Sequence, residues 1–315
     1  MTTLITGAGL VGASFAQHAA RRGEPVVFLD PAPREAFLRA KLGNAGWRLV
    51  NEDVQSLPGL IGAIEDCGAE TVVHTASLIG ARVADPIHRG YAVNIGGAMN
   101  VAEAVRLCGV KRLVHLSTFG VYDWRRIHAG PVAEDAPRGQ GTPYSNSKVS
   151  QELIFEACRR QYGFELMVLR PANVFGVGHF AAGSGGGRKV QDLVTAGIAG
   201  ETARIPQAQT MAFVYLYAKD MGRAVDLAAT VPAPQATNVF NLGYDVVTSF
   251  DDLVETIRRQ LPKLKVEIEP GTPPVSRDFP LDVSAAREHL GWTPEYTMDE
   301  AFADYIADMK AETGL

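Results

Sequence analysis

The 315-residue sequence has few cysteines, no long apolar segment and no excess of positive charge. Its three cysteines, Cys67, Cys108 and Cys158, are far apart and form no Cys-x-x-Cys pair. This spacing argues against a disulfide framework and a structural zinc site, and it favours a reducing compartment. No apolar run approaches the roughly 18 residues that span a membrane. Strand-like sequence begins at Thr3, which leaves no room for a secretory signal, and we expect a cytoplasmic protein.

The charge balance and the histidines exclude two further classes. The chain carries 30 Lys and Arg against 35 Asp and Glu, a net charge of -5, so it lacks the positive field that nucleic acids require. Neither His74 nor His115 has a cluster of carboxylates or cysteines beside it, so no metal site is expected. With 46% hydrophobic and 21% charged residues, the composition is that of a globular protein of one large or two modest domains.

Short β-branched runs alternate with longer amphipathic stretches in the first half of the chain. This alternation predicts βαβ units and an α/β fold with a doubly wound parallel sheet. We predict strands at Thr3–Thr6, Pro25–Asp30, Trp47–Val50, Thr71–His74, Arg112–Leu116, Glu165–Arg170 and Asn238–Asn241. We predict helices at Val11–Arg22, Leu57–Asp66, Arg89–Leu107, Tyr144–Tyr162, Val190–Ala199, Asp220–Ala229, Phe250–Leu261 and Met298–Met309.

The composition changes after Arg170, where glycine-rich and proline-rich loops interrupt the alternation. We therefore expect a nucleotide-binding domain over residues 1–170 and a mainly substrate-binding domain over residues 171–315. The strand Asn238–Asn241 can return to the sheet of the first domain. The glycine run Gly183–Gly187 is compatible with a mobile lid and with a flexible linker, and the sequence does not choose between them.

A glycine pattern near the start of the chain indicates a phosphate-binding loop. Residues 4–12 read Leu-Ile-Thr-Gly-Ala-Gly-Leu-Val-Gly, a G-x-G-x-x-G pattern between a predicted strand and a predicted helix. Gly7 can make the tight turn, Gly9 lets backbone amides approach a pyrophosphate, and Gly12 allows close helix–strand packing. The helix N-terminus adds partial positive charge, so we expect a dinucleotide here. The alternative is a turn that only needs positive φ.

Two carboxylates follow at the ends of the next predicted strands. Asp30 ends the second strand, where a carboxylate that accepts both ribose hydroxyls repels a 2′-phosphate and favours NAD over NADP. Arg34 can partly offset this repulsion, and the alternative role of Asp30 is a helix N-cap before Pro31. Asp53 follows the third strand and can accept a hydrogen bond from the adenine amino group, or it can be a solvated turn residue.

Tyr144 and Lys148 stand at positions i and i+4 of a predicted helix and therefore share one face. A free tyrosine, with a pKa of about 10, is a poor base near neutral pH, but a neighbouring ammonium favours the phenolate. We therefore expect the pair to perform general acid–base chemistry, with Lys148 lowering the pKa of Tyr144. Lys148 is also expected to hold the nicotinamide ribose.

The same spacing recurs at Tyr215 and Lys219, so spacing alone does not locate the site. Thr118 follows the predicted strand Arg112–Leu116, at the sheet edge where ligands bind in open α/β folds. The helix with Tyr144 comes next, so Thr118 can donate to a substrate oxygen while Tyr144 exchanges the proton. Tyr215 is better interpreted as a strand residue, and we place the chemistry at Tyr144.

These motifs resemble those of the extended short-chain dehydrogenase/reductases, also described as the NAD-dependent epimerase/dehydratase family. Four further segments are similar to the family's motifs in order and spacing, so that the resemblance covers nearly the whole chain: residues 93–100, 117–122, 169–176 and 290–294. They resemble the family's Asn-Val-x-Gly-Thr-x-Asn helix, its Ser-Ser/Thr-x-x-Val-Tyr segment, its Leu-Arg-Pro-x-Asn-Val-Tyr-Gly and its closing Leu-Gly-Trp-x-Pro. The resemblance implies a Rossmann-type fold with a smaller C-terminal substrate-binding domain. It also implies NAD as cofactor and a homodimer formed through the Arg89–Leu107 and Tyr144–Tyr162 helices.

The resemblance also implies roles for single residues. It implies Thr118, Tyr144 and Lys148 as the catalytic set. It further implies Asn94 as a helix-distorting support for the lysine–water network and Asn173 as a substrate contact, although either asparagine can instead satisfy backbone groups at an irregular turn. We expect the cofactor to contact Gly7, Gly9, Leu10, Val11, Gly12, Asp30, Asp53, Val54, Thr75, Ala76, Asn94, Tyr144 and Lys148. We expect the substrate to contact Ser77, Thr118, Phe119, Tyr144, Asn173, His179 and Arg277.

Three departures from the family pattern limit these expectations. The phosphate loop is one residue shorter than the usual Gly-x-x-Gly-x-x-Gly, which alters geometry more than function. Phe119 and Gly120 follow Thr118 where the family's sugar dehydratases have Asp-Glu, so water elimination is not expected. Met211 stands where many nucleotide-sugar members have an arginine, and a neutral side chain cannot replace a bidentate phosphate clamp. A diphosphate would need other cations, of which Arg277 is the best placed.

Three functions stay open on the sequence. The first is an NAD-dependent oxidoreductase or epimerase that acts on a hydroxyl or keto carbon of a sugar, sugar acid or related small polar substrate. The second is a nucleotide-sugar epimerase with tightly held NAD. The third is a non-catalytic dinucleotide-sensing protein, whose expected signature is loss of the Tyr, Lys and Thr set, and all three residues are present. The sequence does not separate a dehydrogenase from an epimerase.

Overall fold

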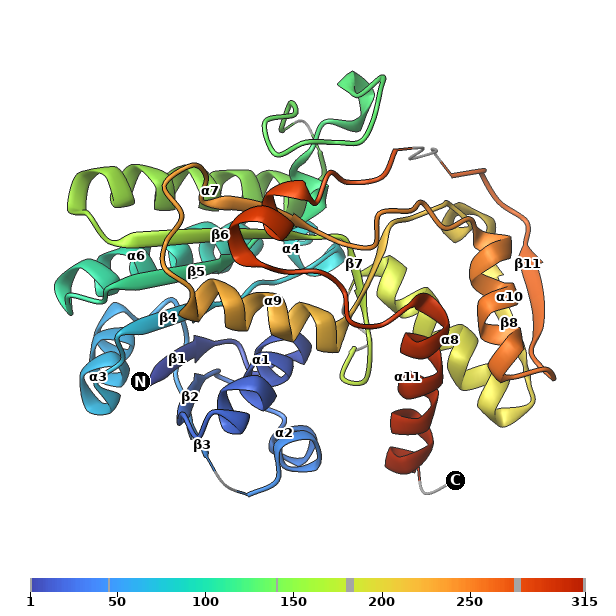
Figure 1. The fold of residues 1–315 in the computed structure, drawn as a ribbon, viewed down its shortest axis with the longest axis horizontal. Helices are drawn as coiled ribbons and strands as arrows, with labels where there is room; N and C mark the ends of the chain where they lie inside the picture. The colour runs from blue at the N-terminus through green and yellow to red at the C-terminus, as the bar shows by residue number, and fades with distance from the viewer. Residues whose placement is uncertain (1, 45, 140, 180–183, 275–278, 314–315) are drawn as a thin grey trace.

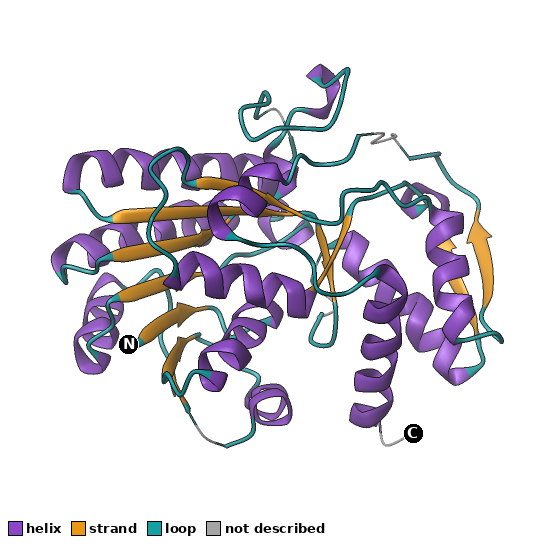
Figure 2. Ribbon diagram, in the orientation of Figure 1, coloured by secondary structure: helices purple, strands orange, loops and turns teal. Residues whose placement is uncertain are grey.

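The computed structural model describes residues 2–44, 46–139, 141–179, 184–274 and 279–313. A central sheet lies between two layers of helices, and a smaller group of helices and short strands lies beyond the carboxyl ends of its strands (Figures 1 and 2). The three-layer arrangement buries both faces of the sheet. This explains why several strands read in the sequence as continuous apolar runs.

The central sheet has seven strands in the order β10-β6-β5-β4-β1-β2-β3, and every neighbouring pair is parallel. The predicted doubly wound parallel sheet is therefore confirmed. The order reverses between β1 and β4, which makes this point the crevice where ligands bind in such sheets. The strands are β1 (Thr3–Thr6), β2 (Val26–Leu29), β3 (Trp47–Val50), β4 (Thr71–His74), β5 (Arg112–Leu116), β6 (Glu165–Pro171) and β10 (Val239–Leu242). The Asn238–Asn241 region thus contributes an edge strand beside β6.

Successive side chains of each strand pack in two separate cores, because they point to opposite faces of the sheet. Ile5 packs in the core under α1 and α9, whereas its neighbour Leu4 packs in the core under α3, α6 and α7. These five helices span Leu10–Arg21 (α1), Leu57–Cys67 (α3), Gly97–Leu107 (α6), Pro143–Tyr162 (α7) and Ala218–Thr230 (α9).

Helix α7 has clear start and stop signals. The Thr142 side chain caps its N-terminus by accepting a hydrogen bond from the Ser145 backbone N–H, and Pro143 occupies the first turn. Gly163, with φ of +82°, ends the helix in the left-handed region. These signals place Tyr144 in the first turn, at the carboxyl edge of the sheet.

The C-terminal part is built from helices and two small parallel pairs of strands. Strand β7 (Asn173–Phe175) follows β6 and pairs with β9 (Tyr215–Tyr217), while β8 (Thr202–Pro206) pairs with β11 (Lys265–Glu269). Phe302 of the last helix stacks on Phe175, with ring centroids 4.7 Å apart, which joins that helix to β7. The helices here are α8 (Gly185–Ala199), α10 (Phe250–Gln260) and α11 (Met298–Thr313).

The structure differs from the predicted elements in several places, and the short strands β7, β8 and β11 were not predicted. The helix α2 (Glu35–Leu42) was not predicted, because its eight residues bury only Phe37 and Leu38 and leave a weak apolar period. The predicted helix Arg89–Leu107 is divided into α5, a π-helical turn and α6. The remaining short elements are α4 (Ala81–Ala84), α5 (Ile87–Tyr91), η1 (Ala92–Gly96), η2 (Phe119–Val121), η3 (Trp124–Arg126), η4 (Gln207–Gln209) and η5 (Ala286–Leu290).

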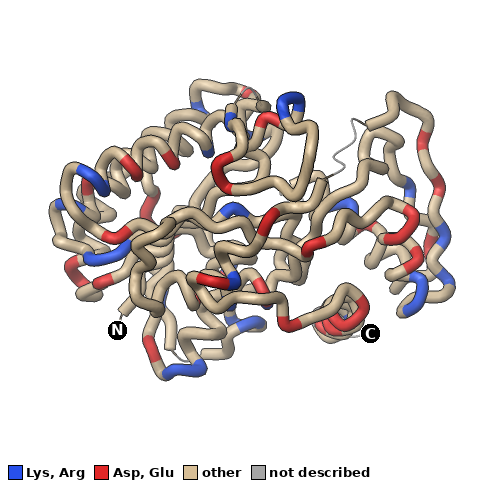
Figure 3. The backbone as a smooth tube through the Cα atoms, turned by 45° about the horizontal axis from the view of Figure 1, so that its top comes forward, with Lys and Arg blue, Asp and Glu red and all other residues tan. Residues whose placement is uncertain are grey.

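Charged residues of both signs are distributed along the whole chain (Figure 3). Many of them are paired at the surface, as Lys111 is with Glu70 and Arg259 is with Asp299. Within the described ranges, none of the helices combines the length and the apolar character that crossing a bilayer requires.

Candidate active site

A cavity of about 1040 Å³ opens at the carboxyl edge of the central sheet, beside the reversal of strand order. It is lined by the segments that follow β1, β2, β4, β5 and β6, and it extends to the start of α8. This volume lies at the upper end of small-molecule sites, which hold about 300–1,000 Å³. The predicted site residues on its wall are Gly7, Gly9, Leu10, Val11, Asp30, Asp53, Val54, Thr75, Ala76, Ser77, Thr118, Phe119, Tyr144, Asn173 and His179.

Some predicted site residues are not on this wall. Gly12, Asn94 and Lys148 are buried behind it, and Arg277 lies outside the described residues. One side of the cavity is formed by Gln209, Met211 and Phe213; the family resemblance drew attention to Met211, but Gln209 and Phe213 were not among the predicted site residues. These residues reach the cavity because β9, which follows them, pairs with β7, a contact that no local sequence pattern shows.

The three glycines of the first loop have different environments. Gly7 has φ of +90°, and a Cβ there would lie 2.8 Å from Thr75 Oγ1 and 2.9 Å from the Ala76 backbone nitrogen. A Cβ on Gly9 would meet no atom within 4 Å, which leaves the cavity side of the loop open to a ligand. A Cβ on Gly12 would lie 2.8 Å from the Gly7 carbonyl oxygen, so α1 approaches β1 closely. This cradle fits a dinucleotide pyrophosphate at the N-terminus of α1.

Two acidic side chains line the same end of the cavity. Asp30 accepts hydrogen bonds from the backbone N–H groups of Ala8 (2.9 Å) and Ala32 (2.8 Å), which joins the end of β2 to the glycine loop. The alternative that Asp30 caps a helix is wrong, because the next helix begins at Glu35. Asp53 accepts from the Gln55 backbone N–H at 2.9 Å and lies in a turn.

We predict that Asp30→Asn shifts the cofactor preference toward NADP. The amide keeps the shape of the side chain but removes the negative charge that repels a 2′-phosphate, and like-charge juxtaposition costs several kcal/mol. The ratio of the NADP and NAD dissociation constants, measured by fluorescence titration, should fall by at least about tenfold, or 1.4 kcal/mol. Asp53→Asn, in the same cavity, should leave the ratio unchanged. An unchanged ratio in Asp30→Asn would show that Asp30 does not determine the preference for NAD over NADP.

The predicted catalytic residues meet at the end of β5. The Tyr144 phenol is hydrogen-bonded to the Thr118 side chain, and both residues line the cavity. Lys148 lies one turn further along α7, with 2% of its surface exposed, and its Nζ donates to the Leu116 backbone carbonyl at 2.8 Å. The structure therefore brings together the phenol, the ammonium and the hydroxyl that the sequence motifs predict.

The pKa of Tyr144 differs from the prediction. Burial raises the pKa of the phenol to about 12, and the hydrogen bond with Thr118 opposes this rise only in part. Burial also lowers the pKa of the Lys148 ammonium to about 7, against the attraction of Glu152. Desolvation penalises both charged forms, so proximity of Lys148 to Tyr144 does not by itself produce a phenolate.

Asn94 lies in the π-helical turn Ala92–Gly96, whose widened backbone agrees with a distorted helix at this point. Its Oδ1 accepts from the Leu78 backbone N–H (2.8 Å), and its Nδ2 donates to Ser147 Oγ on α7 (2.9 Å). The Asn94 backbone carbonyl accepts from Gln151, also on α7. Asn94 thus joins the loop after β4 to the helix that carries Tyr144. These contacts agree with the alternative that Asn94 satisfies backbone groups at an irregular turn. Its link to a lysine–water network stays a prediction.

Asn173 and His179 contact the first turn of α8. Asn173 is 6% exposed and its Nδ2 has no hydrogen-bond partner among the described residues, while a Cβ on Gly186 would lie 2.4 Å from its Oδ1. His179 Nε2 lies 3.1 Å from the Ser184 carbonyl oxygen. A Cβ on Gly187 would lie 2.2 Å from the His179 ring. Small residues are therefore required where α8 meets the cavity.

The described part of the glycine run Gly183–Gly187 is helical, and its role as a lid stays a prediction. Gly185, Gly186 and Gly187 form the first turn of α8, and the Ser184 hydroxyl caps that turn by accepting from the Gly187 N–H at 3.2 Å. Gly183 lies outside the described residues. The packing of this first turn against Asn173 and His179 outweighs the low helix propensity of its glycines.

The two buried histidines lie beneath this site. His74 Nδ1 is hydrogen-bonded to Thr6 Oγ1 at 2.7 Å, and the His74 ring stacks on His115 with centroids 5.6 Å apart. Burial lowers the pKa of His74 to about 3, so this histidine is an uncharged residue of the core near neutral pH. No group of three or more potential metal ligands is present among the described residues.

A parallel sheet with a glycine-rich loop at its switch point and a Tyr-x-x-x-Lys pair beside that loop defines a nicotinamide-dependent enzyme of the short-chain dehydrogenase/reductase type. The chain matches the NAD dependent epimerase/dehydratase family over residues 3–243, and it belongs to this family. The family resemblance noted in the sequence is therefore confirmed, and the family is described as NAD-dependent, in agreement with the expected cofactor.

Several relatives match the chain over nearly its full length. A UDP-glucose 4-epimerase of Mycolicibacterium smegmatis is 30% identical over 314 residues, 97% of each chain. The crystal structure of UDP-glucose 4-epimerase from Thermotoga maritima with UDP-glucose is 24% identical, with a TM-score of 0.86, and the match covers 99% of this chain and 100% of that one. The Thermus thermophilus UDP-glucose 4-epimerase in complex with NAD is 23% identical, with a TM-score of 0.84 over 98% and 99% of the two chains.

Proposed function

We propose that the protein is an NAD-dependent epimerase or oxidoreductase that acts on a hydroxyl or keto carbon of a sugar-like substrate. The observation that carries this proposal is the hydrogen bond between Tyr144 and Thr118, one turn of α7 from the Lys148 ammonium. Tyr144 and Thr118 line a cavity that begins at the glycine loop, and Lys148 is buried behind its wall. We further propose that residues 1–170 hold NAD and residues 171–315 mainly hold the substrate.

The residues of the chain divide the chemistry among them. NAD held at the glycine loop would supply hydride transfer to and from the carbinol carbon of the substrate. Thr118 donates a hydrogen bond to the reacting oxygen, and Tyr144 takes the hydroxyl proton and later gives it back. Lys148, whose Nζ donates to the Leu116 carbonyl, is the residue that would hold the nicotinamide ribose.

A nucleotide sugar is the substrate class that the relatives support. The chain aligns over 97% of its length with a UDP-glucose 4-epimerase. The far end of the cavity contains the N-terminus of the fifteen-residue helix α8, with Ser184, Gly185 and Gly186 on the wall. Backbone N–H groups at such a terminus favour an anionic group. The unpartnered amide of Asn173 lies against the same turn.

An unconjugated sugar or sugar acid is a second candidate, and Met211 favours it. Met211 lines the cavity together with Gln209 and Phe213, so this wall is neutral where many nucleotide-sugar enzymes have an arginine. Two arginines, Arg82 and Arg89, line another part of the cavity, on the short helices α4 and α5. A small anionic substrate could be held by these arginines without a diphosphate site.

The assay that tests the function follows the absorbance of reduced nicotinamide. Purified protein with NAD is offered nucleotide sugars, free sugars and sugar acids in separate reactions. A rising signal would identify a dehydrogenase and its substrate class. Conversion of UDP-glucose to its C4 epimer with no net reduced cofactor would identify an epimerase. Neither result, with NAD shown to bind, would contradict the proposed activity toward these classes.

We also propose a homodimer formed through α6 and α7, which lie side by side (Figure 1). Four large apolar side chains on these helices are exposed by half or more, an unusual amount for a monomer surface. They are Met99 (56%), Leu107 (50%), Leu153 (56%) and Tyr162 (52%). Pairing of this face with its copy about a two-fold axis would bury all four residues on each chain.

The double substitution Met99→Glu with Leu153→Glu is expected to convert this dimer to a monomer. Each carboxylate placed in a self-complementary apolar interface loses its hydration without gaining a partner. Size-exclusion chromatography with light scattering measures the mass of both proteins. Ile268→Glu is the control, because Ile268 is 49% exposed on β11, away from α6 and α7. A wild-type protein that elutes as a monomer would rule out the interface.

A cytoplasmic location is proposed on the state of the cysteines. Cys67, Cys108 and Cys158 are all free thiols, and burial raises the pKa of each. Free thiols of this kind are typical of proteins kept in a reducing compartment.

A further inference from the structure

The catalytic helix α7 contacts the end of β5 at three successive turns. Tyr144, Lys148 and Glu152 are spaced four residues apart, so their side chains leave the helix on one face. Their partners are three consecutive residues: Thr118 for Tyr144, the Leu116 carbonyl for Lys148 (2.8 Å) and the Ser117 hydroxyl for Glu152 (2.5 Å). The third contact is not part of the acid–base set described above.

The Glu152 carboxylate is the meeting point of several elements. Only 4% of its side chain is exposed, and Arg170 of β6 donates from Nε (2.9 Å) and Nη2 (2.7 Å) to its two oxygens. Arg138 donates a third charged hydrogen bond, at 2.5 Å. Burial opposes ionisation of Glu152, but the bonds from Arg170 outweigh it and lower the pKa of this carboxyl. The carboxylate is therefore charged and held in one orientation.

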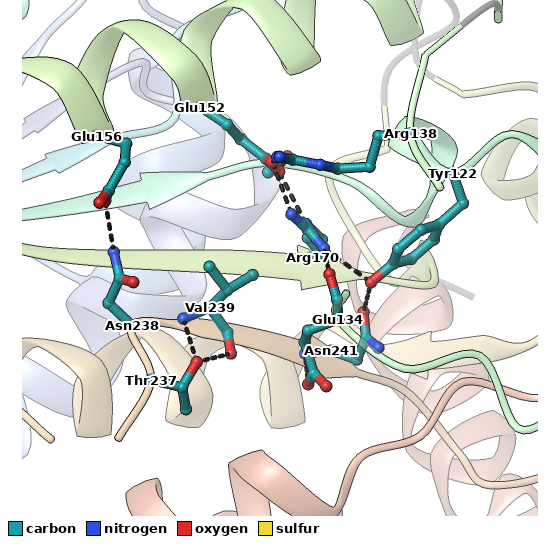
Figure 4. Close-up of polar contacts among 11 residues, drawn as sticks. Tyr122, Glu134, Arg138, Glu152, Glu156, Arg170, Thr237, Asn238, Val239 and Asn241 are labelled. Carbon is teal, nitrogen blue, oxygen red and sulfur yellow. Dashed lines mark hydrogen bonds and ion pairs between the residues drawn. The ribbon is translucent and has the colours of Figure 1, made fainter. Parts of the chain in front are cut away.

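The same network continues to the edge strand β10 (Figure 4). Arg170 Nη1 donates to the Tyr122 hydroxyl at 3.0 Å, and that hydroxyl donates to Asn241 Oδ1 at 2.6 Å. The Asn241 backbone N–H donates to Glu134 at 2.8 Å. Arg170 is thus fixed from both sides, and Glu152 receives a rigid support from two strands of the central sheet.

We propose that Glu152 is a positioning residue for the reaction, which acts by holding Ser117 and therefore the neighbouring Thr118 at a set distance from Tyr144. The proposal rests on the catalytic set of the proposed function. Thr118 begins the turn Phe119–Val121, and its own side chain bonds locally to the Gly120 N–H. The link from Ser117 to Glu152 therefore fixes the strand end relative to α7.

The charge of Glu152 also acts on Lys148. The charged and titratable groups around Lys148 are Tyr144 and Glu152 on α7, His74 on β4, His115 on β5 and Arg170 on β6. Both histidines have pKa values far below neutrality because they are buried, so they carry no charge near neutral pH. Glu152 raises the pKa of Lys148, which burial lowers to about 7. Without this carboxylate the ammonium would lose its proton at lower pH.

The variant Glu152→Gln tests the proposal in the NAD-loaded protein. Turnover of UDP-glucose, or of whichever sugar responds in the nicotinamide assay, should fall by about 10–100-fold with KM nearly unchanged, because displacement of a reacting group by about 1 Å has this effect. The alkaline limb of the pH profile of kcat/KM should move to lower pH, since Lys148 is then deprotonated earlier. Amide hydrogen exchange at Ser117–Gly120, which needs no substrate, should become faster.

Glu156→Gln is the matched control. Glu156 lies one turn further along α7, is ionised with a pKa lowered to about 2 by hydrogen bonds from Arg159 and Arg160, and contacts Asn238 but not β5 (Figure 4). This variant should keep wild-type turnover, pH profile and exchange. If Glu152 only stabilised the fold, Glu152→Gln would lower the melting temperature but keep wild-type turnover below it.

Ser117→Ala separates position from charge and covers the case in which Glu152→Gln does not fold. It removes only the hydroxyl contact, so turnover should fall and exchange should rise while the alkaline limb stays in place. Wild-type turnover and exchange in Ser117→Ala would overturn the positioning role. If Tyr144→Phe is inactive while Glu152→Gln behaves as wild type, the positioning role fails and the proposed function stands. If Tyr144→Phe is active, the proposed function itself fails.

Discussion

Tyr144→Phe is expected to reduce turnover by about 10²–10⁴-fold, the usual contribution of a general acid–base residue. The substitution removes the hydroxyl that we propose exchanges the proton and keeps the ring that lines the cavity. NAD affinity should therefore stay close to that of the wild type. Turnover is measured in the nicotinamide or epimerisation assay, and NAD binding is measured by fluorescence titration of the same preparations.

The control for this experiment is provided by the second Tyr-x-x-x-Lys pattern of the chain. Tyr215 lies in β9, is 1% exposed and packs edge-on against Phe213 and Phe175, so it is a core residue. Tyr215→Phe makes the same chemical change and should retain turnover. A Tyr144→Phe enzyme with near wild-type turnover would show that another group moves the proton.

Gly7→Ala is expected to weaken NAD binding strongly. The backbone of Gly7 has φ of +90°, and an added Cβ would come within 2.9 Å of the Ala76 backbone nitrogen, which cannot move aside as a side chain can. Left-handed strain and overpacking each cost about 1–3 kcal/mol. Displacement of the loop should raise the dissociation constant of NAD by up to about 100-fold, and thermal unfolding should show lower stability.

Gly23→Ala is the matched control for Gly7→Ala. Gly23 also has positive φ, +71°, but a Cβ there would meet no atom within 4 Å, and the residue follows α1 on the surface. The control therefore carries the backbone strain without the clash. It should lower stability and leave the NAD dissociation constant unchanged. Equal loss of NAD binding in both variants would show that the tight approach at Gly7 is not what shapes the cofactor loop.

The strands and the first loop were predictable because their signals are local. A strand buried on both faces has consecutive apolar residues at its centre, as in the Leu-Ile of β1, the Val-Val of β4 and the Leu-Val of β5, so these strands could be recognised from short windows. The roles expected of Gly7, Gly9 and Gly12 depend only on neighbours in the βαβ unit, and so does the shared face of Tyr144 and Lys148. Helix α2, with little apolar surface to bury, gives a weaker signal and was missed.

The cavity beyond the catalytic residues was harder to predict, because it combines segments that are far apart in the chain. The glycine run before α8 has low helix propensity, yet Gly186 and Gly187 are helical, and Asn173 and His179 leave no space for larger side chains there. Likewise, Met211 reaches the cavity only through the pairing of β9 with β7. The pKa of Tyr144 depends on how deeply the phenol is buried, which no residue spacing reports.

The sequence by itself determined the class of fold, the dinucleotide loop, the acid–base pair and the family, because each rests on residues a few positions apart. Only the tertiary structure decided which residues surround that pair. Ser117 is 35 positions before Glu152 and Arg170 is 18 positions after it, yet both donate hydrogen bonds to the buried carboxylate of Glu152. A buried charge is stable only when it is hydrogen-bonded and paired, and the tertiary structure supplies these partners from distant parts of the sequence.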